Sequence, residues 1–489
     1  FDELFFLQLL LALRRYHFKH EEKGISYKVE SKLARQLVDS LPFSLTQAQR
    51  RVIEEIAEDM KTPKPMNRLL QGDVGSGKTI VALLAMLVAI DNGYQVAFMA
   101  PTEILADQHF RTIASFLKSI PVNVRLLIGG QRKKLREDIL EDIRSGNAKI
   151  VVGTHALIEE NVRFASLGLA VIDEQHRFGV MQRAALREKG YNPDVLVMTA
   201  TPIPRTLAMT IYGDLDVSVI DELPANRKPV RTATRLEDQK PKVYDFVKDE
   251  VQRGRQVYVV FPLIEESEKV DLKAATKEFE HLQGKVFPGL KLGLIHGRMK
   301  TEEKDAVMAA FKSGGIHILV STTVIEVGID VPNATVMIIE NAERFGLSQL
   351  HQLRGRVGRG GDQSYCVLIA DYTWFDTRKR GKDLFALQEE KDVARIRLDT
   401  MVETNDGFKI AEVDLKLRGP GEFFGTKQSG LPGFRIANLV DDADLLQVAR
   451  KEAFAVVEQD PQLRSSSNKS IRKHFETHFK DIFDLGKVG

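Results

Sequence analysis

Short apolar runs alternate with helical patterns across residues 67–223 of the 489-residue chain. Seven runs are rich in valine, isoleucine and leucine: RLLQG, QVAFMAP, VRLLIGG, KIVVGTH, LAVIDE, DVLVMTATP and DVSVID. Runs that are apolar on both faces are typical of buried parallel strands joined by helical crossovers. This part of the chain therefore predicts an α/β domain built on a parallel sheet.

A second series of apolar runs follows a polar interruption. The segment ELPANRKPVRT at 222–232 contains two prolines and several charges, which is typical of a linker. After it come QVYVVFPLI, KLGLIHG, HILVSTTVIEVGID, TVMIIEN and SYCVLIADY. The chain is therefore expected to hold two parallel α/β sheets in tandem, with no short-period repeat.

The sequence predicts helices and one glycine-rich loop outside the two sheets. RKRGKDLFALQEEKDVARIRL and DADLLQVARKEAFAVV have helical patterns, and RGPGEFFGTKQSG lies between them at 418–430. The glycines of this loop permit unusual dihedral angles, and its two phenylalanines can pin it to a core. The alternative is a surface crossover without a function of its own. No role is assigned to the charged segment 372–401.

Four domains are predicted: a helical leader at 1–40, a first lobe at 41–225, a second lobe at 226–372, and a C-terminal helical hairpin, loop and helices at 373–489.

Composition excludes several classes of protein. The net charge of +2 excludes a uniformly basic protein, so nucleic acid would have to bind at local patches. One cysteine, Cys366, excludes an internal disulfide framework and fits a reducing cytoplasm; its apolar neighbours predict a core position. The apolar runs LFFLQLLLAL and IVALLAMLVAI are shorter than the roughly 18 residues of a membrane span. The first run also lacks the basic flank and cleavage site of a signal peptide.

GDVGSGKT at 72–79 fits the phosphate-binding P-loop pattern. Glycines at 72, 75 and 77 allow a tight turn whose backbone N–H groups face a phosphate at a helix N-terminus. Lys78 would reach the β- and γ-phosphates of ATP, and the hydroxyl of Thr79 would bind Mg²⁺. A turn that fits the pattern by chance is the alternative. A short strand before the loop and an apolar helix after it favour the P-loop.

VIDEQH at 171–176 supplies the carboxylates that such a site needs. Asp173 would hold Mg²⁺ through water, and Glu174 would orient or deprotonate the attacking water. Most Asp-Glu pairs are solvated surface carboxylates, but this pair ends an apolar strand. QLRGRVGR at 352–359 places Arg356 and Arg359 three residues apart, so that on a helix both can face one γ-phosphate as arginine fingers.

Eight motifs follow one another in the order of the superfamily 2 helicases and translocases: GDVGSGKT, APTEILADQH, VGTHAL, DEQH, TATPIPR, HGRM, STTVIEVGIDVP and QLHQLRGRVGR. This resemblance spans residues 43–360 and implies two RecA-like P-loop lobes that bind ATP, Mg²⁺ and nucleic acid. PFSLTQAQ resembles the adenine-sensing Q motif. The resemblance also implies that Gln49 recognises the adenine, that Asp330 acts near the ribose and that Gln352 takes part in catalysis. It implies DNA backbone contacts for Thr102, Thr154, His155, Arg298 and Thr322. It implies that Thr199 and Thr201 couple hydrolysis to lobe movement.

DEQHRFGV together with RGPGEFFGTKQSG resembles the RecG family of bacterial ATP-dependent DNA helicases more narrowly. The resemblance implies remodelling of stalled replication forks and branched DNA in recombination and repair, including fork reversal and Holliday junction processing. It implies that the loop converts lobe closure into movement along duplex DNA, with Arg418 and Gln428 as its polar contacts. The chain would be the motor portion, without the N-terminal wedge domain of the family.

The same resemblance implies a partner set and leaves alternatives. Expected partners are branched or forked double-stranded DNA and the single-stranded DNA-binding protein, with a monomer acting in the bacterial cytoplasm. The relative Mfd is the runner-up, although 489 residues leave no room for its additional modules. A non-translocating ATP switch that clamps DNA is one further alternative, and a single-strand translocase on RNA is another.

Overall fold

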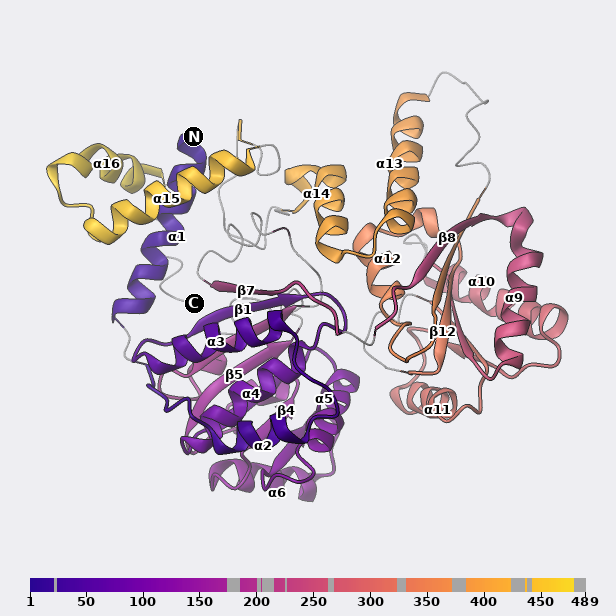
Figure 1. Cartoon of the computed structure of the whole chain (residues 1–489), viewed down its shortest axis with the longest axis horizontal. Coiled ribbons are helices and arrows are strands. Elements are labelled where there is room, and N and C mark those ends of the chain that lie inside the picture. Colours follow the sequence, from indigo (N-terminus) through magenta and orange to yellow (C-terminus); the bar gives the residue numbers. More distant parts are fainter. Residues whose placement is uncertain are drawn as a thin grey trace. The chain divides into compact units, whose positions relative to one another are not determined.

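A computed structural model describes the chain at residues 1–21, 24–173, 185–199, 204, 215–224, 227–262, 268–322, 331–371, 384–423, 436–437 and 442–478. Its contacts form two compact units (Figure 1). Unit 1 comprises Phe1–Pro224 and Arg418–Gly489, and unit 2 comprises Ala225–Leu417. The units group the chain differently from the four ranges predicted above, because the C-terminal region is divided between them.

Unit 1 contains a seven-stranded parallel sheet in the order β3-β4-β2-β5-β6-β1-β7. All seven predicted strands are confirmed: β1 Asn67–Gly72, β2 Gln95–Met99, β3 Val124–Leu127, β4 Ile150–Gly153, β5 Leu167–Asp173, β6 Asp194–Thr199 and β7 Asp216–Ile220. Five helices connect or precede the strands: α2 Lys32–Ser40, α3 Gln47–Lys61, α4 Lys78–Asp91, α5 Glu103–Phe116 and α6 Lys133–Arg144.

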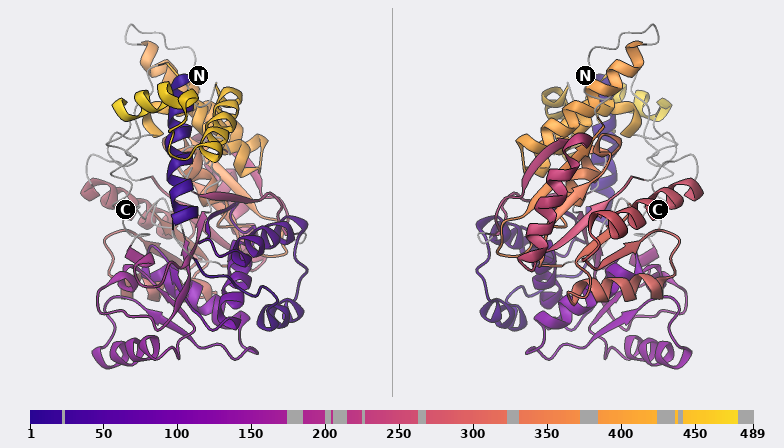
Figure 2. Two further views of the ribbon diagram at one scale, coloured as in Figure 1. Left: turned by 90° about the vertical axis from the view of Figure 1, so that its left-hand side faces the viewer. Right: turned by 90° about the vertical axis from the view of Figure 1, so that its right-hand side faces the viewer.

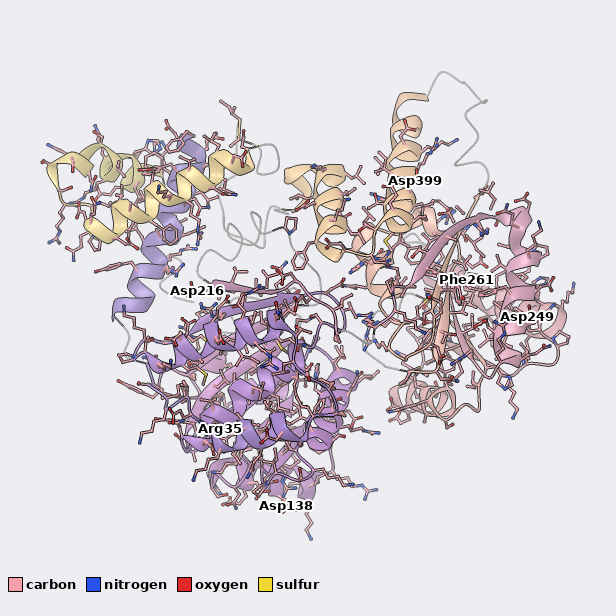
Figure 3. All side chains as sticks on the ribbon, in the orientation of Figure 1. Arg35, Asp138, Asp216, Asp249, Phe261 and Asp399 are labelled. Carbon is pink, nitrogen blue, oxygen red and sulfur yellow. The ribbon has the colours of Figure 1, made fainter. Side chains whose placement is uncertain are left out.

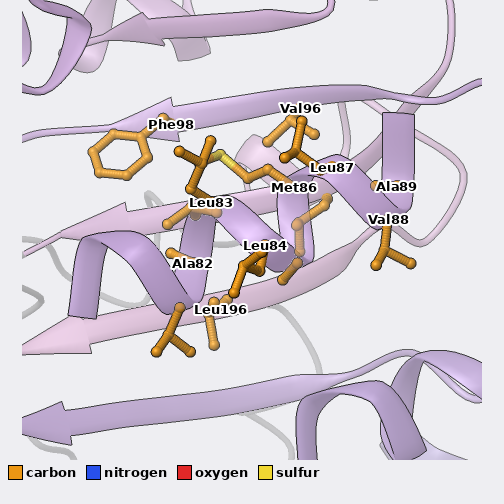
Figure 4. Packing of buried hydrophobic residues seen from close by; sticks show 14 of the residues in the cluster. Ala82, Leu83, Leu84, Met86, Leu87, Val88, Ala89, Val96, Phe98 and Leu196 are labelled. Atoms are coloured by element: carbon orange, nitrogen blue, oxygen red, sulfur yellow. The ribbon is translucent and has the colours of Figure 1, made fainter. Parts of the chain in front are cut away.

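Helix α4 forms the centre of the unit 1 core. Every residue from 80 to 90 is buried, so this helix is covered on all sides by α2, α3 and the sheet. Its side chains pack beside Phe98 of β2 and Leu196 of β6 (Figure 4). Burial of apolar surface is the main stabilising term in folding, so the helix that carries the P-loop is held firmly by the core. Its all-round hydrophobicity follows from this position.

The first helix and two helices of the C-terminal region belong to unit 1. Helix α1, Asp2–Glu21, packs against α15, Ala443–Gln459, and α16, Lys469–His478, follows (Figure 2). Arg15 of α1 forms an ion pair with Asp216 at the start of β7; Asp216 is labelled in Figure 3. Glu3 Oε2 accepts hydrogen bonds from the backbone N–H groups of Ile436 and Ala437 at 3.1 and 2.9 Å. The N-terminal helix therefore binds both α15 and the two residues that precede it at 436–437.

Unit 2 contains a six-stranded parallel sheet in the order β10-β11-β9-β12-β13-β8. Without its edge strand β7, the first sheet has the order β3-β4-β2-β5-β6-β1, and adding seven to each number gives the order of the second sheet. The two sheets therefore share one topology. The strands are β8 Arg231–Leu236, β9 Gln256–Val260, β10 Leu292–Ile295, β11 Ile318–Ser321, β12 Ala334–Ile339 and β13 Tyr365–Ala370. The prediction of two tandem parallel α/β lobes is confirmed.

The helices of unit 2 include two that follow its sheet in sequence. They are α9 Lys240–Gln252, α10 Glu268–His281, α11 Thr301–Lys312, α12 Leu347–Arg354, α13 Leu384–Glu403 and α14 Gly407–Phe423. Shorter helical segments are η1 His155–Ile158, η3 Glu237–Gln239, η4 Leu282–Val286, η6 Ala342–Arg344 and η8 Ser466–Asn468. Leu398 and Met401 of α13 and Ile410 of α14 are buried in the core of this unit. The helix predicted at 378–398 is confirmed over its described part, 384–398, and the helix predicted at 442–457 is confirmed as α15.

Two predicted boundaries are wrong. The linker predicted at 222–232 overlaps β8, which begins at Arg231; this edge strand is only partly buried and its sequence, RTATRL, is too polar to stand out. The loop predicted at 418–430 begins as helix, because α14 continues to Phe423. Residues 424–430 lie outside the described part of the chain.

Two simpler predictions concern Cys366 and membrane spans. Cys366 is buried on β13, and burial raises the pKa of its thiol to about 12, as expected of a core residue. Among the residues that the structure describes, no helix has the length and apolar character needed to cross a membrane.

Asp194 gives a test of the unit 1 core. Its carboxylate is buried at the start of β6 and accepts the Met66 N–H at 2.7 Å, and burial raises its pKa well above the usual value. A raised folded-state pKa lowers stability as pH rises above about 4, at about 1.4 kcal/mol per pKa unit.

We therefore expect Asp194→Asn to raise the melting temperature at pH 8 and to reduce the loss of stability between pH 5 and pH 8. Melting curves at both pH values measure this. Asp39→Asn, at an exposed position, is the control. An unchanged or lower melting temperature of Asp194→Asn at pH 8 would contradict the assignment.

Candidate nucleotide site and nucleic-acid interface

The P-loop lies between the end of β1 and the start of α4. Gly75 and Gly77 have φ angles of 77° and 87°, a region that L side chains rarely adopt. At Gly72 a Cβ atom would lie 2.6 Å from Ser76 Oγ. All three predicted glycines are therefore required by the backbone, which closes into a tight turn before the N-terminus of α4.

Lys78 lies inside this turn. Its Nζ donates to the backbone carbonyls of Gly72 at 2.7 Å and Asp73 at 2.9 Å. Ser76 Oγ is buried without a hydrogen-bond partner in the described part of the chain. An ammonium group, a buried hydroxyl and a helix N-terminus in one small loop fit an anionic phosphate. Thr79, next in sequence, is half-buried.

Gln49 ties helix α3 to the P-loop. Its Nε2 donates to the Ser76 carbonyl at 2.8 Å, and its Oε1 accepts the Thr46 N–H at 2.9 Å as part of a capping box. A Cβ atom on Gly77 would lie 2.3 Å from the same Nε2. Both ends of the amide therefore contact protein, and Gln49 supports the loop from behind.

Asp173 ends β5 at the same edge of the sheet as the P-loop. The register places Gln71 of β1 opposite Thr199 of β6, and Met198 of β6 opposite Asp173. Parallel strands bring their carboxyl ends to one edge, so the predicted metal ligand Asp173 and the buried Thr199 lie along the edge where the P-loop begins. Asp173 Oδ2 contacts His109 Nε2 of α5 at 2.8 Å, and both side chains are nearly buried.

In unit 2, the predicted arginine fingers follow α12. Gly358, with φ of 79°, turns the chain between Arg356 and Arg359, and Gln352 lies on α12 itself. Burial and the charge of Arg227 lower the pKa of Arg359 to about 10. Two half-buried guanidinium groups of like sign make this part of unit 2 favourable for an anion.

The segment before β8 is fixed against this turn. Gln363 Nε2 donates to the Pro229 carbonyl at 2.9 Å, and the Arg231 N–H donates to the Ser364 carbonyl at 2.9 Å. A Cβ atom on Gly358 would lie 2.9 Å from Val230 Cγ2. Residues 229–231 of the predicted linker therefore pack on the arginine-bearing turn and the residues after it.

Arg354 joins α12 to the two helices that follow the sheet. Its Nη1 donates to the carbonyls of Met401 and Thr404 at 2.9 and 2.8 Å, and its Nη2 lies 3.0 Å from His351 Nδ1. Ser348 Oγ, also on α12, donates to Asp414 Oδ2 of α14 at 2.8 Å. Helices α12, α13 and α14 are therefore connected by buried and half-buried polar contacts within unit 2.

Two of the predicted DNA contacts occupy equivalent places in the two sheets. Thr154 follows β4 and Thr322 follows β11, its counterpart; both hydroxyls are buried and have no hydrogen-bond partner among the described residues. His155 and Arg298 are exposed. Thr102 caps α5, where its Oγ1 accepts the Leu105 N–H at 3.3 Å.

Several predicted site residues lie outside the described part of the chain: Glu174, Thr201, Asp330 and Gln428. The Arg418 side chain is likewise not described, although its backbone belongs to α14. The sequence prediction missed His109, Arg227 and Arg354. His109 and Arg354 are within quoted motifs, but only tertiary contacts show what they bind.

Three family models match successive parts of the chain. Residues 46–210 match the DEAD/DEAH box helicase model, and residues 239–361 match the helicase conserved C-terminal domain. Residues 404–485 match domain 3, C-terminal, of the ATP-dependent DNA helicase RecG. The matches follow the order of the two sheets and the C-terminal region.

Curated relatives named ATP-dependent DNA helicase RecG match nearly all of the chain. The Synechocystis protein is 52% identical over 96% of the chain and 55% of its own length. The Aquifex aeolicus protein is 54% identical over 100% of the chain and 60% of its own length. The Staphylococcus epidermidis protein is 46% identical over 99% of the chain and 68% of its own length. The chain thus spans a little over half the length of the first two.

Solved structures agree. RecG bound to a three-way DNA junction matches with a TM-score of 0.71 and 50% identity, over 91% of this chain and 56% of that one. Yeast Dbp5 bound to RNA and ADP-BeF3 matches with a TM-score of 0.52 at 17% identity, over 87% of this chain and 98% of that one, which shows the shared fold only. On these identities and coverages, the chain belongs to the RecG family of ATP-dependent DNA helicases.

Proposed function

We propose that this chain is the ATP-driven motor of a double-stranded DNA translocase that remodels stalled forks and branched DNA in recombination and repair. The observation that carries the proposal is the P-loop, with Lys78 bound inside it and Asp173 on the same sheet edge. Fork reversal and Holliday junction processing are the expected reactions. A RecG protein has been solved bound to a three-way DNA junction, which supports branched DNA as the substrate.

The nucleotide site is assigned as follows. The loop at 72–79 and Lys78 bind the ATP phosphates, while Thr79 and Asp173 would hold Mg²⁺. Bound Mg²⁺ would neutralise phosphate charge during transfer. Glu174 would orient the attacking water, and Asp330 would act near the ribose. Gln49 supports the loop, and it would have to exchange one of its two protein contacts to recognise the adenine. The donor set fits the group, because the loop offers an ammonium group and a buried hydroxyl, and β5 ends in a carboxylate.

Arg356, Arg359 and Gln352 would complete the site from the second lobe. They belong to a different compact unit from the P-loop. Hydrolysis then requires the lobes to close on ATP, and loss of product lets them open. A desolvated guanidinium such as Arg359 stabilises the charge that develops on the γ-phosphate.

The C-terminal region would convert this closure into movement along DNA. The flank of the loop RGPGEFFGTKQSG before residue 418 is held in unit 2 through Ser348–Asp414 and Arg354. The flank after residue 435 is held in unit 1 through Glu3. These contacts at both flanks support a role for the loop in transmitting lobe movement. Arg418 and Gln428 are the proposed contacts to the duplex.

We assign DNA backbone contacts to Thr102, Thr154, His155, Arg298 and Thr322, and coupling to Thr199 and Thr201. The equivalent places of Thr154 and Thr322 in two sheets of one topology support the same role for both residues. The expected state is a monomer in the bacterial cytoplasm, with the single-stranded DNA-binding protein as a further partner. A DNA clamp driven by ATP is the alternative; the match of residues 404–485 to RecG favours the translocase.

Removal of phosphate or water contacts should stop chemistry but not DNA binding. Lys78→Ala or Glu174→Gln should abolish ATP hydrolysis, because phosphate clamping or water orientation is lost while no DNA contact changes. Phosphate release and DNA anisotropy measure the two activities. Hydrolysis at the wild-type rate in either variant would refute the assigned role.

The arginine finger should act on turnover and not on ATP affinity. Arg359→Ala should lower kcat by roughly 10³-fold or more, because the negative charge that develops on the γ-phosphate in the transition state loses the guanidinium that stabilises it. Steady-state kinetics and equilibrium binding of ATP measure the two terms. A defect confined to KM would instead assign Arg359 to ground-state binding.

Variants of the loop should lose movement along DNA while they keep ATP hydrolysis. Arg418→Ala or Gln428→Ala should keep most DNA-stimulated hydrolysis but lose displacement of a third strand from a triplex, because the ATP site is intact and the contact to the duplex is gone. Both rates and a melting curve are measured for each variant. A proportional fall of both rates, or unchanged displacement, would show that the loop does not couple the two.

A further inference from the structure

His109 of α5 is bound directly to the proposed metal ligand. Its Nε2 lies 2.8 Å from Asp173 Oδ2. An ionised carboxylate can only accept, so His109 carries the proton on Nε2 and donates it. The side chains are 13% and 11% exposed, and the His109 ring packs at 4.6 Å between centroids on Phe98 of β2. This contact fixes one oxygen of Asp173 in a low-dielectric environment, where a hydrogen bond is strong.

The helix that carries His109 begins at a proposed DNA contact. Thr102 caps α5 and His109 follows seven residues later, two turns or about 10 Å along the axis. Ala106 and Ile113 on the same stripe are fully buried, so this face of α5 lies on the core. Helix α5 packs on the core through these two residues, and most of its other side chains are half-buried. A displacement at its N-terminus would be transmitted along this continuous helix to His109.

We propose that His109 is a positioning residue that holds Asp173 and couples it to DNA bound at the N-terminus of α5. The proposal rests on the function proposed above, which places DNA backbone at Thr102 and Mg²⁺ at Asp173. A helix N-terminus favours a backbone phosphate, and occupancy there fixes where α5 sits on the sheet. The hydrogen bond from His109 then sets the orientation of the Asp173 carboxylate, and so the geometry of metal and water.

The test compares three variants. His109→Ala removes the donor, His109→Gln keeps an N–H donor on a side chain of similar reach, and Arg111→Ala is the control on the same helix. Arg111 is 71% exposed and pairs only locally, with Asp107 at 2.7 Å. Melting curves report whether each variant is folded.

Two readouts are measured on each variant. The first is the equilibrium Kd of a fluorescent ADP analogue in Mg²⁺ and in EDTA, which needs no turnover. For His109→Ala we expect an unchanged Kd in EDTA and about 10-fold less tightening by Mg²⁺, the size of effect that partners of metal ligands show. The second is the ratio of ATP turnover with and without duplex DNA, which should be largely lost although DNA anisotropy is unchanged. His109→Gln should recover part of both, and Arg111→Ala should match wild type.

The outcomes divide as follows. Wild-type Mg²⁺ tightening and DNA stimulation in His109→Ala would overturn the proposal. An equal loss of affinity for the ADP analogue in Mg²⁺ and in EDTA would also overturn it, because His109 would then contribute only to the folded structure. Lost Mg²⁺ tightening with normal DNA stimulation would also overturn it, because coupling to DNA would be absent. If Lys78→Ala still hydrolyses ATP, the proposed function fails by a separate result.

Discussion

The carboxyl edge of a parallel sheet is the constraint on which this structure depends. Parallel strands joined by crossover helices must all end at one edge, so short polar sequences that follow different strands are brought together there. In unit 1 this edge receives the P-loop after β1, Asp173 from β5, Thr199 from β6 and Thr154 after β4. The burial of α4 then fixes the P-loop, because the helix that follows it cannot shift without disturbing the core.

The second sheet repeats this topology but uses its carboxyl edge differently. It has no glycine-rich turn between β8 and α9, where the first sheet has its P-loop; instead the acidic segment Glu237–Gln239 leads into α9. At the start of α9, Lys240 Nζ forms an ion pair with the buried carboxylate of Glu340 at 3.1 Å. The ammonium group of this lysine is therefore already paired within the second lobe. In the proposed function, two lobes of one topology have different roles: the first would bind phosphates, and the second would supply arginines and a helical extension.

Most of the fold followed from apolar runs, and most of the unit 1 site followed from motifs. Buried strands such as β2 and β12 are unmistakable because both faces are apolar. β8 was missed because an edge strand need not be apolar, and the helical start of 418–430 was missed because glycine and proline argue against helix. The contacts of Gln49, His109 and Arg354 could not be predicted, since each depends on residues distant in sequence meeting in the folded chain. Local patterns contain no such information.

Movement along duplex DNA is the central claim, and the delay before triplex displacement tests it most directly. A third strand is placed at increasing distances from the end of a blunt duplex, and the lag before its release is recorded with ATP present. A translocase predicts a lag that grows linearly with distance, with ATP consumed in proportion. Release without a distance-dependent lag, or no release despite DNA-stimulated hydrolysis, would contradict the account and indicate a clamp.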